Sequence, residues 1–108
     1  MPLISDKREM NVLQELESWY QSQCNDEWEH GYGIQIDTLD NPGWTVRVDL
    51  KGTSVADRMF TEINDLHHDD EWIKCWVENK QFRAVGGPKQ LERILRVFLD
   101  WTKTEGAA

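Results

Sequence analysis

Strict alternation of apolar and polar residues in two separate segments constrains the fold of this chain more than any other feature of its sequence. Successive side chains of a β-strand point to opposite faces, so a period of two predicts strands that bury one face. Each segment has a turn signal at its centre, which predicts two β-hairpins. The alternating apolar residues are Tyr32, Ile34, Ile36, Trp44, Val46, Val48 and Leu50 in the first hairpin, and Ile73, Cys75, Val77, Phe82 and Ala84 in the second.

The first hairpin is expected to turn at Asn41-Pro42-Gly43. Proline fixes φ and glycine accepts a positive φ, which together are typical of a type II turn. A loop of this length would place Asp37 opposite Arg47 and Ile36 opposite Val48. The apolar sets of the two strands would then share one face.

The second hairpin is expected to turn through two residues, Asn79 and Lys80. This turn would pair Val77 with Phe82 and keep the apolar faces in phase. Lys80 stands where such a turn normally prefers glycine, so either local strain or a longer loop is expected there.

Helical periodicity flanks the strands on both sides. In the N-terminal segment, Asp6 and Glu9 fit a capping box, and Asn25 fits a helix stop. In the C-terminal segment, the Gly86-Gly87-Pro88 sequence is expected to end the sheet and start a helix, because proline is favoured at the first helical position. The apolar stripes are Val12, Leu13, Leu16, Trp19, Tyr20 and Cys24 in the first helix, and Leu91, Ile94, Leu95, Phe98 and Trp101 in the second.

Residues 53–66 fit two interpretations. Val55, Met59 and Ile63 have helical spacing, whereas the same segment also fits a turn followed by a strand, which is the interpretation that we favour. The pattern as a whole predicts an α+β fold, in which an antiparallel β-meander of four to five strands is flanked by an N-terminal and a C-terminal helix.

The chain has 108 residues, which fits a single domain. We expect this domain to span residues 10–103. Residues 1–9 are expected to form a loosely ordered extension and residues 104–108 a frayed tail.

The charge balance bears on the class of partner. The chain has 12 Lys and Arg residues against 20 Asp and Glu residues, a net charge of -8. Such a chain is not expected to bind nucleic acid, which requires cations that displace counterions. The excess of acid either attracts a basic partner, whose encounter it accelerates, or serves solubility.

The cysteines and the apolar runs bear on location. Cys24 and Cys75 lack the Cys-x-x-Cys spacing of metal sites, and we expect reduced thiols in a cytoplasmic protein. The N-terminal sequence lacks the apolar stretch of a signal peptide, and no run approaches membrane-spanning length. No phosphate loop or dinucleotide fingerprint is present, so no cofactor and no membrane association are expected.

Six tryptophans are many for so small a domain. Exposed tryptophan is typical of binding hot spots. Trp72 and Trp76 share the strand face opposite Cys75, and either a helix or a partner must cover them.

A cluster of acidic residues around Trp28 is the main candidate for chemistry. Glu27 or Glu29 together with His30 would form an acid and base pair in a small enzyme. A zinc site would need three or four convergent ligands. His67 and His68 are neighbours whose side chains diverge in a strand, so a solvated loop suits them better than a metal site.

Several blocks of the sequence resemble the bacterial immunity protein 53 family. They are the early "WY", then "EWEHGYGIQIDTLDNPGWTVRVDL", "DEWIKCWVENKQF" and "GGPKQLERILRVFLDW". The resemblance runs from Met10 to Trp101, although Lys80 departs from the Asn-Gly-like turn of the family. It implies an immunity protein of a polymorphic toxin system, which binds and neutralises a cognate toxin and is not an enzyme.

The resemblance and the charge together predict a partner-binding surface for a cognate, basic toxin. In this interpretation Trp28 is the anchor and the carboxylates contact Lys or Arg, whereas the alternative places Trp28, Tyr32 and Trp44 in the core. Replacement of Glu27 and Glu29 by Lys is expected to weaken binding without changing the melting temperature. The predicted surface comprises Asp26, Glu27, Trp28, Glu29, His30 and Tyr32, extended by Asp69, Asp70 and Glu71.

Two other functions stay open at this point. One is the small enzyme that uses Glu27, Glu29 and His30. The other is a homo-oligomeric structural protein that associates through the Trp72 and Trp76 face. The sequence leaves the oligomeric state undetermined.

Overall fold

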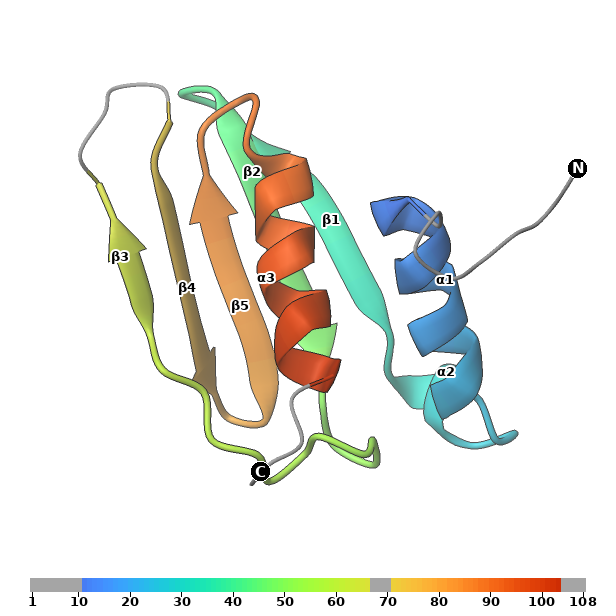
Figure 1. The fold of residues 1–108 in the computed structure, drawn as a ribbon. Helices are drawn as coiled ribbons and strands as arrows, with labels where there is room; N and C mark the ends of the chain where they lie inside the picture. Colours follow the sequence, from blue (N-terminus) through green and yellow to red (C-terminus); the bar gives the residue numbers. More distant parts are fainter. Residues whose placement is uncertain (1–10, 67–70, 104–108) are drawn as a thin grey trace, which may run out of the picture.

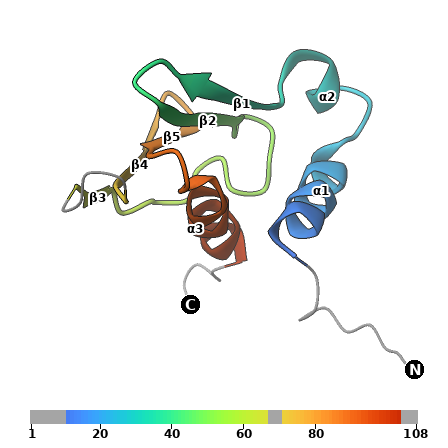
Figure 2. The same ribbon diagram turned by 90° about the horizontal axis from the view of Figure 1, so that it is seen from above.

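The computed structural model of the protein describes residues 11–66 and 71–103. Its five strands form one antiparallel sheet, and α1 and α3 lie on the same side of that sheet (Figures 1 and 2). The elements in chain order are α1 (Val12–Gln23), α2 (Trp28–Gly31), β1 (Ile34–Leu39), β2 (Gly43–Asp49), β3 (Ile63–Asp65), β4 (Ile73–Glu78), β5 (Gln81–Gly86) and α3 (Leu91–Lys103). The predicted α+β class with flanking helices is confirmed.

The order of strands across the sheet is β1-β2-β5-β4-β3. The last three strands form a meander, and β5 joins it to the β1–β2 hairpin by pairing with β2. The chain is therefore a hairpin and a meander side by side, with β1 and β3 at opposite edges, and not one continuous meander.

The register of the first hairpin differs from the prediction. Ile36 pairs with Val46, two residues away from its predicted partner, and the loop is Asp40-Asn41-Pro42. Gly43 is the first residue of β2 because β2 passes close to β5 there, and a Cβ atom on Gly43 would clash with the carbonyl oxygen of Gly86. A shift of two residues leaves every side chain on its predicted face, so the shared apolar face survives the error.

The second hairpin follows the prediction. Val77 pairs with Phe82 and Cys75 with Ala84. Asn79 and Lys80 have φ angles of 52° and 56°, so both adopt the left-handed conformation that a two-residue type I′ turn requires. A hydrogen bond to the segment after β2 stabilises this turn, since the Lys80 carbonyl accepts from the backbone N–H of Leu50 at 2.8 Å.

Both long helices begin later than the sequence indicated. A capping box of Asn11 and Gln14 starts α1, whereas the predicted Asp6 and Glu9 lie outside the described residues. The start of α3 is Leu91 and not Pro88, since residues 87–90 form a turn in which the N–H of Gln90 bonds to the Gly87 carbonyl. The predicted extension at 1–9 and tail at 104–108 also lie outside the described residues.

Residues 53–66 form turns and then the short strand β3, as favoured from the sequence. Val55 is buried beneath these turns, and the Phe60 ring packs edge-on against Phe82 at 5.5 Å between centroids. The segment closes one end of the core without forming a helix.

The core lies between α3 and the sheet. Phe98 is fully buried, with its ring centroid 4.9 Å from that of Trp19 in α1 and 5.0 Å from that of Phe82 in β5. Cys75 is buried as predicted, and its burial raises the thiol pKa to about 12. Leu99 joins the predicted stripe of α3, while Leu13 and Tyr20 are exposed, contrary to the prediction for α1.

The opposite face of the sheet carries the side chains that alternate with the core residues. Trp76 lies on this face, half-buried, and the Lys74 ammonium is 5.3 Å from its ring centroid. Both α1 and α3 lie on the other side (Figure 2). The sequence left either a helix or a partner to cover Trp76. In the described part of the chain, no helix covers it.

Candidate partner-binding surface

A tight turn between α1 and α2 positions the acidic cluster. The Asn25 side chain accepts hydrogen bonds from the backbone N–H groups of Glu27 and Trp28, at 3.0 and 2.9 Å. In return, the Glu29 carboxylate accepts from the N–H groups of Asn25 and Asp26, both at 2.8 Å. Asn25 directly follows Cys24, the C-cap of α1, near the helix end that the sequence predicted, and its side chain also stabilises the turn into α2.

Glu29 thus holds the turn together. Hydrogen bonds from backbone N–H groups, first its own and then those of Asn25 and Asp26, lower the pKa of its carboxyl group. In contrast with the expectation from the sequence, this geometry predicts that replacing Glu29 by Lys lowers stability, because a lysine would place further donors against two backbone donors.

Trp28 belongs to the core and not to the surface. It is 3% exposed, and its ring lies 6.1 Å from Trp19 and 5.8 Å from Tyr20 between centroids. A side chain this deeply buried supports the surface from below, which is the core position that the sequence offered as the alternative to an interface anchor.

Tyr32 and Trp44 do not form the alternative core stack with Trp28 either. Tyr32 is 40% exposed and is the C-cap residue of α2. It lies two residues before β1, which begins at Ile34. Trp44 is half-buried and donates its indole N–H to the Pro88 carbonyl at 2.9 Å.

The remaining cluster residues face solvent. Asp26, Glu27 and His30 are exposed. Glu27 and Tyr32 border a shallow hollow of about 190 Å³, together with Lys51. Asp26 has a φ angle of 74°, a conformation that aspartate tolerates better than most residues.

The predicted extension does not join this surface. Glu71 is exposed and directly precedes β4, the neighbour of the edge strand β3. The β4 strand begins at the end of the sheet away from α2 (Figure 1). The α2 helix instead leads into β1, which is the opposite edge. Asp69 and Asp70 lie outside the described residues.

The fold gathers negative charge over α1, α2 and β1. Residues 11–43 contain no Lys or Arg, so this part of the chain carries nearly the whole net charge of -8. We call the surface formed by α1, α2 and β1 the anionic surface. Its acidic residues, including those of the β1–β2 loop, are Glu15, Glu17, Asp26, Glu27, Glu29, Asp37 and Asp40.

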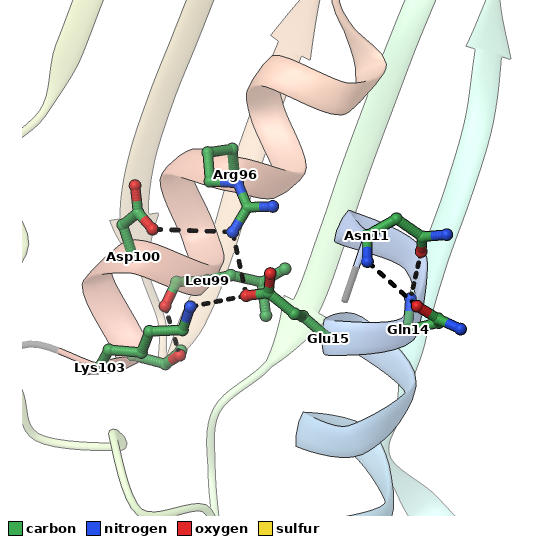
Figure 3. Close-up of polar contacts among 8 residues, drawn as sticks. Asn11, Gln14, Glu15, Arg96, Leu99, Asp100 and Lys103 are labelled. Atoms are coloured by element: carbon green, nitrogen blue, oxygen red, sulfur yellow. Dashed lines mark hydrogen bonds and ion pairs between the residues drawn. The ribbon is translucent and has the colours of Figure 1, made fainter. Parts of the chain in front are cut away.

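Glu15 is the member of this set that α3 neutralises. Its carboxylate contacts Arg96 at 2.9 Å and Lys103 at 2.6 Å (Figure 3). These two cations, Arg96 first, lower the pKa of Glu15. The pairing joins α1 to α3 and leaves the other acidic side chains to define the potential of the anionic surface.

The sequence already indicated this surface, because no Lys or Arg occurs between Arg8 and Arg47. Sequence reasoning concentrated on the dense cluster at 26–30. It did not connect Glu17, Asp37 and Asp40 with that cluster, because their arrangement on one surface depends on how α1 and β1 are placed.

The geometry also bears on metal and acid–base chemistry. A lowered pKa keeps Glu29 ionised at neutral pH, whereas a general acid must hold a proton there. Within residues 11–66 and 71–103, no three His, Cys, Asp or Glu side chains gather closely enough to hold a metal ion. His67 and His68 lie outside those ranges.

Among the residues that the structure describes, no helix has the length and apolar character needed to cross a membrane. The fold and the charge distribution together define a small, acidic α+β protein whose most pronounced feature is its one-sided anionic surface. The family model described as Immunity protein 53 matches residues 13–103, which is most of the chain. The chain therefore belongs to the immunity protein 53 family and has an immunity function. Searches of curated proteins and of solved structures returned no match.

Proposed function

We propose that this protein binds a basic cognate toxin in the cytoplasm and neutralises it by occlusion, without catalysis. The observation that carries the proposal is the concentration of acidic residues, without a single Lys or Arg, over residues 11–43. A partner with a complementary basic surface is steered toward such a field and oriented by it.

The composition of the anionic surface supports contact with a protein. Tyr20 and Tyr32 are each 40% exposed beside the acidic residues. Tyrosine is enriched at interface centres, where its ring is buried and its hydroxyl finds a partner, and charged residues typically surround such a centre. The two cysteines, both free thiols, agree with a reducing compartment.

The experiment that tests this function is co-expression with the toxin domain encoded beside this gene. Growth rescue together with a stable complex of the two purified proteins is the expected result. Rescue without a complex would contradict occlusion and would direct attention to a catalytic mode of protection. A folded protein that gives neither rescue nor complex would contradict the proposed function as a whole.

A further inference from the structure

The β1 strand is an open edge of the sheet. Its inner side pairs with β2, and no other described strand pairs with its outer side. The N–H of Asp49 bonds to the Gly33 carbonyl at 3.0 Å. Because hydrogen-bonded pairs alternate along an antiparallel ladder, Gln35 and Asp37 also bond to β2, while the backbone groups of Ile34 and Ile36 point away from the sheet.

The two edges of the sheet differ in how they are protected. The edge strand β3 is short, with three residues. The edge strand β1 is longer, with six residues, and its Ile36 side chain is 38% exposed. Proteins usually shorten, charge or cover an edge strand, because its free backbone groups are a template for another strand.

A groove lies between this edge and α1. Leu16, Glu17 and Tyr20 of α1 form one wall, Gly33 and Ile34 form the other, and the groove encloses about 380 Å³. Leu13 lies on the same stripe of α1 as Leu16, one turn earlier, and is 56% exposed.

Exposed apolar side chains concentrate at this place. Six large hydrophobic side chains are exposed in the described part of the chain, and four of them belong to α1, to β1 or to the segment that joins them. The four are Leu13, Tyr20, Tyr32 and Ile36. The groove remains open because α1 is attached to α3, through Glu15 with Arg96 and through Trp19 with Phe98, and not to β1.

We propose that the toxin adds one of its own strands to β1, which rests on the proposed function and specifies how the toxin is held. The backbone of the added strand pairs with Ile34 and Ile36. Its alternate side chains enter the groove under α1, so apolar residues are required at those positions. Lys or Arg is expected at its other positions, because these point to the opposite face of the sheet, where Asp37 of β1 lies.

The first test uses the backbone of Ile36. Ile36→Pro removes an N–H group that makes no bond within the sheet and blocks the edge, a change that edge strands tolerate. Ile36→Val keeps the N–H group and a β-branched side chain. We expect Ile36→Pro to weaken binding of the toxin domain encoded beside this gene at least about tenfold, and Ile36→Val to stay within about twofold. Equal affinities of two folded variants would overturn the proposal.

The second test probes the groove and remains informative if Ile36→Pro fails to fold. Leu13→Lys places a charge on the stripe of α1 that continues from the groove wall at Leu16, whereas Met59→Lys changes a side chain that is 90% exposed elsewhere. We expect Leu13→Lys to weaken toxin binding at least about tenfold and Met59→Lys to leave it unchanged. Weakening of similar size by both, or by neither, would overturn the role of the groove.

The third test observes strand addition directly by amide exchange in the wild-type complex. The amides of Ile34 and Ile36 are expected to exchange quickly in the free protein and to become protected in the complex, while those of Gln35 and Asp37 are protected in both. A complex that neutralises the toxin but leaves Ile34 and Ile36 unprotected would overturn strand addition and preserve the proposed function.

Two further outcomes differ from a complex that leaves Ile34 and Ile36 unprotected. If the wild-type protein forms no complex, the proposed function fails, and strand addition fails with it. If the free protein forms a dimer at rising concentration, with Ile34 and Ile36 already protected, the edge serves a second copy of this chain and the proposal is overturned.

Discussion

At the scale of single residues, Glu29 shows that an acidic side chain of the anionic surface can also stabilise the turn that carries it. Its carboxylate receives two backbone N–H groups of the turn before α2. Glu29→Gln turns one acceptor into a donor, so we expect a lower melting temperature, while Glu27→Gln leaves it unchanged. Thermal unfolding followed by circular dichroism at pH 7 makes the comparison. Equal melting temperatures for the two variants would contradict this stabilising role.

Asp26 and Glu27 are the acidic residues best suited to test binding without disturbing the fold. Asn is, after glycine, the neutral residue that best tolerates the positive φ of Asp26, so Asp26→Asn combined with Glu27→Gln removes two charges and retains the turn. We expect roughly three- to tenfold weaker toxin binding at an unchanged melting temperature. The matched control, Glu62→Gln with Glu71→Gln, removes the same charge at two exposed positions outside the anionic surface. Weakening of the same size in the control would assign the effect to net charge and not to this site.

Glu15 makes stability depend on pH with a definite sign. Arg96 and Lys103 hold its pKa below the usual 4.5 in the folded state. The pairing therefore stabilises the protein fully above about pH 4.5 and is lost as the pH falls through the folded-state pKa. We expect Glu15→Gln to lose less stability than the wild type on acidification below pH 4.5, and Glu17→Gln to follow the wild type. Urea unfolding at several pH values tests this, and a Glu15→Gln profile as steep as that of the wild type would refute it.

At the scale of elements, the close approach of β2 and β5 depends on glycine. A Cβ atom on Gly43 would meet the backbone carbonyl of Gly86, whereas one on Gly31 would meet nothing within 4 Å. We expect Gly43→Ala to destabilise the fold by about 1–3 kcal/mol, since the backbone of β5 must move. Gly31→Ala is expected to be neutral or to stabilise by up to about 1 kcal/mol, because alanine favours the helix. Chemical denaturation distinguishes the two, and a fully stable Gly43→Ala variant would show that the strands tolerate a wider spacing.

The two hairpins show which features of an element can be predicted from sequence. The second was predicted in full, because a two-residue turn with alternation on both sides leaves one register in phase. In the first hairpin, alternation determined which residues face the core. It did not distinguish the predicted three-residue loop at 41–43 from the observed one at 40–42, because both keep the apolar residues on the same face. The tertiary contact of Gly43 with Gly86 selected between them, and sequence patterns contain no information on that contact.

The helix starts show a similar limit. Asp6 with Glu9 and Asn11 with Gln14 both have capping spacing, and the described α1 uses the second pair. Pro88 was expected to start α3, but the turn at 87–90 places it before the helix, where its carbonyl accepts the Trp44 indole N–H. Local signals therefore located the helices correctly and their first residues less well.

At the scale of the whole molecule, the separation of charge is the property that the fold creates. The acidic cluster near Trp28 was recognised in the sequence, but its connection with Glu17 and Asp37 required α1 and β1 to be placed side by side. Glu71, the described member of the proposed extension, precedes β4, which begins at the end of the sheet away from α2 (Figure 1), so it lies apart from the anionic surface. For Trp28 the sequence left both the core and the interface open, since a tryptophan among charged residues gives no local indication of burial.

A one-sided field predicts that salt controls the rate of encounter with the toxin. The Debye length falls from roughly 10 Å at 0.1 M salt to roughly 3 Å at 1 M. We expect the association rate to fall steeply over this range, with a much smaller change in the dissociation rate. Surface plasmon resonance at several salt concentrations measures both rates. An association rate that is independent of salt would contradict electrostatic steering by the anionic surface.

The measurement that tests the central claim most directly is hydrogen–deuterium exchange mass spectrometry of the protein with and without the toxin domain encoded beside its gene. If the anionic surface holds the toxin, protection on binding will concentrate in peptides from residues 11–43. Protection confined to β4 and β5, around Lys74, Trp76 and Arg83, would show that the toxin binds the open face of the sheet and would contradict the account.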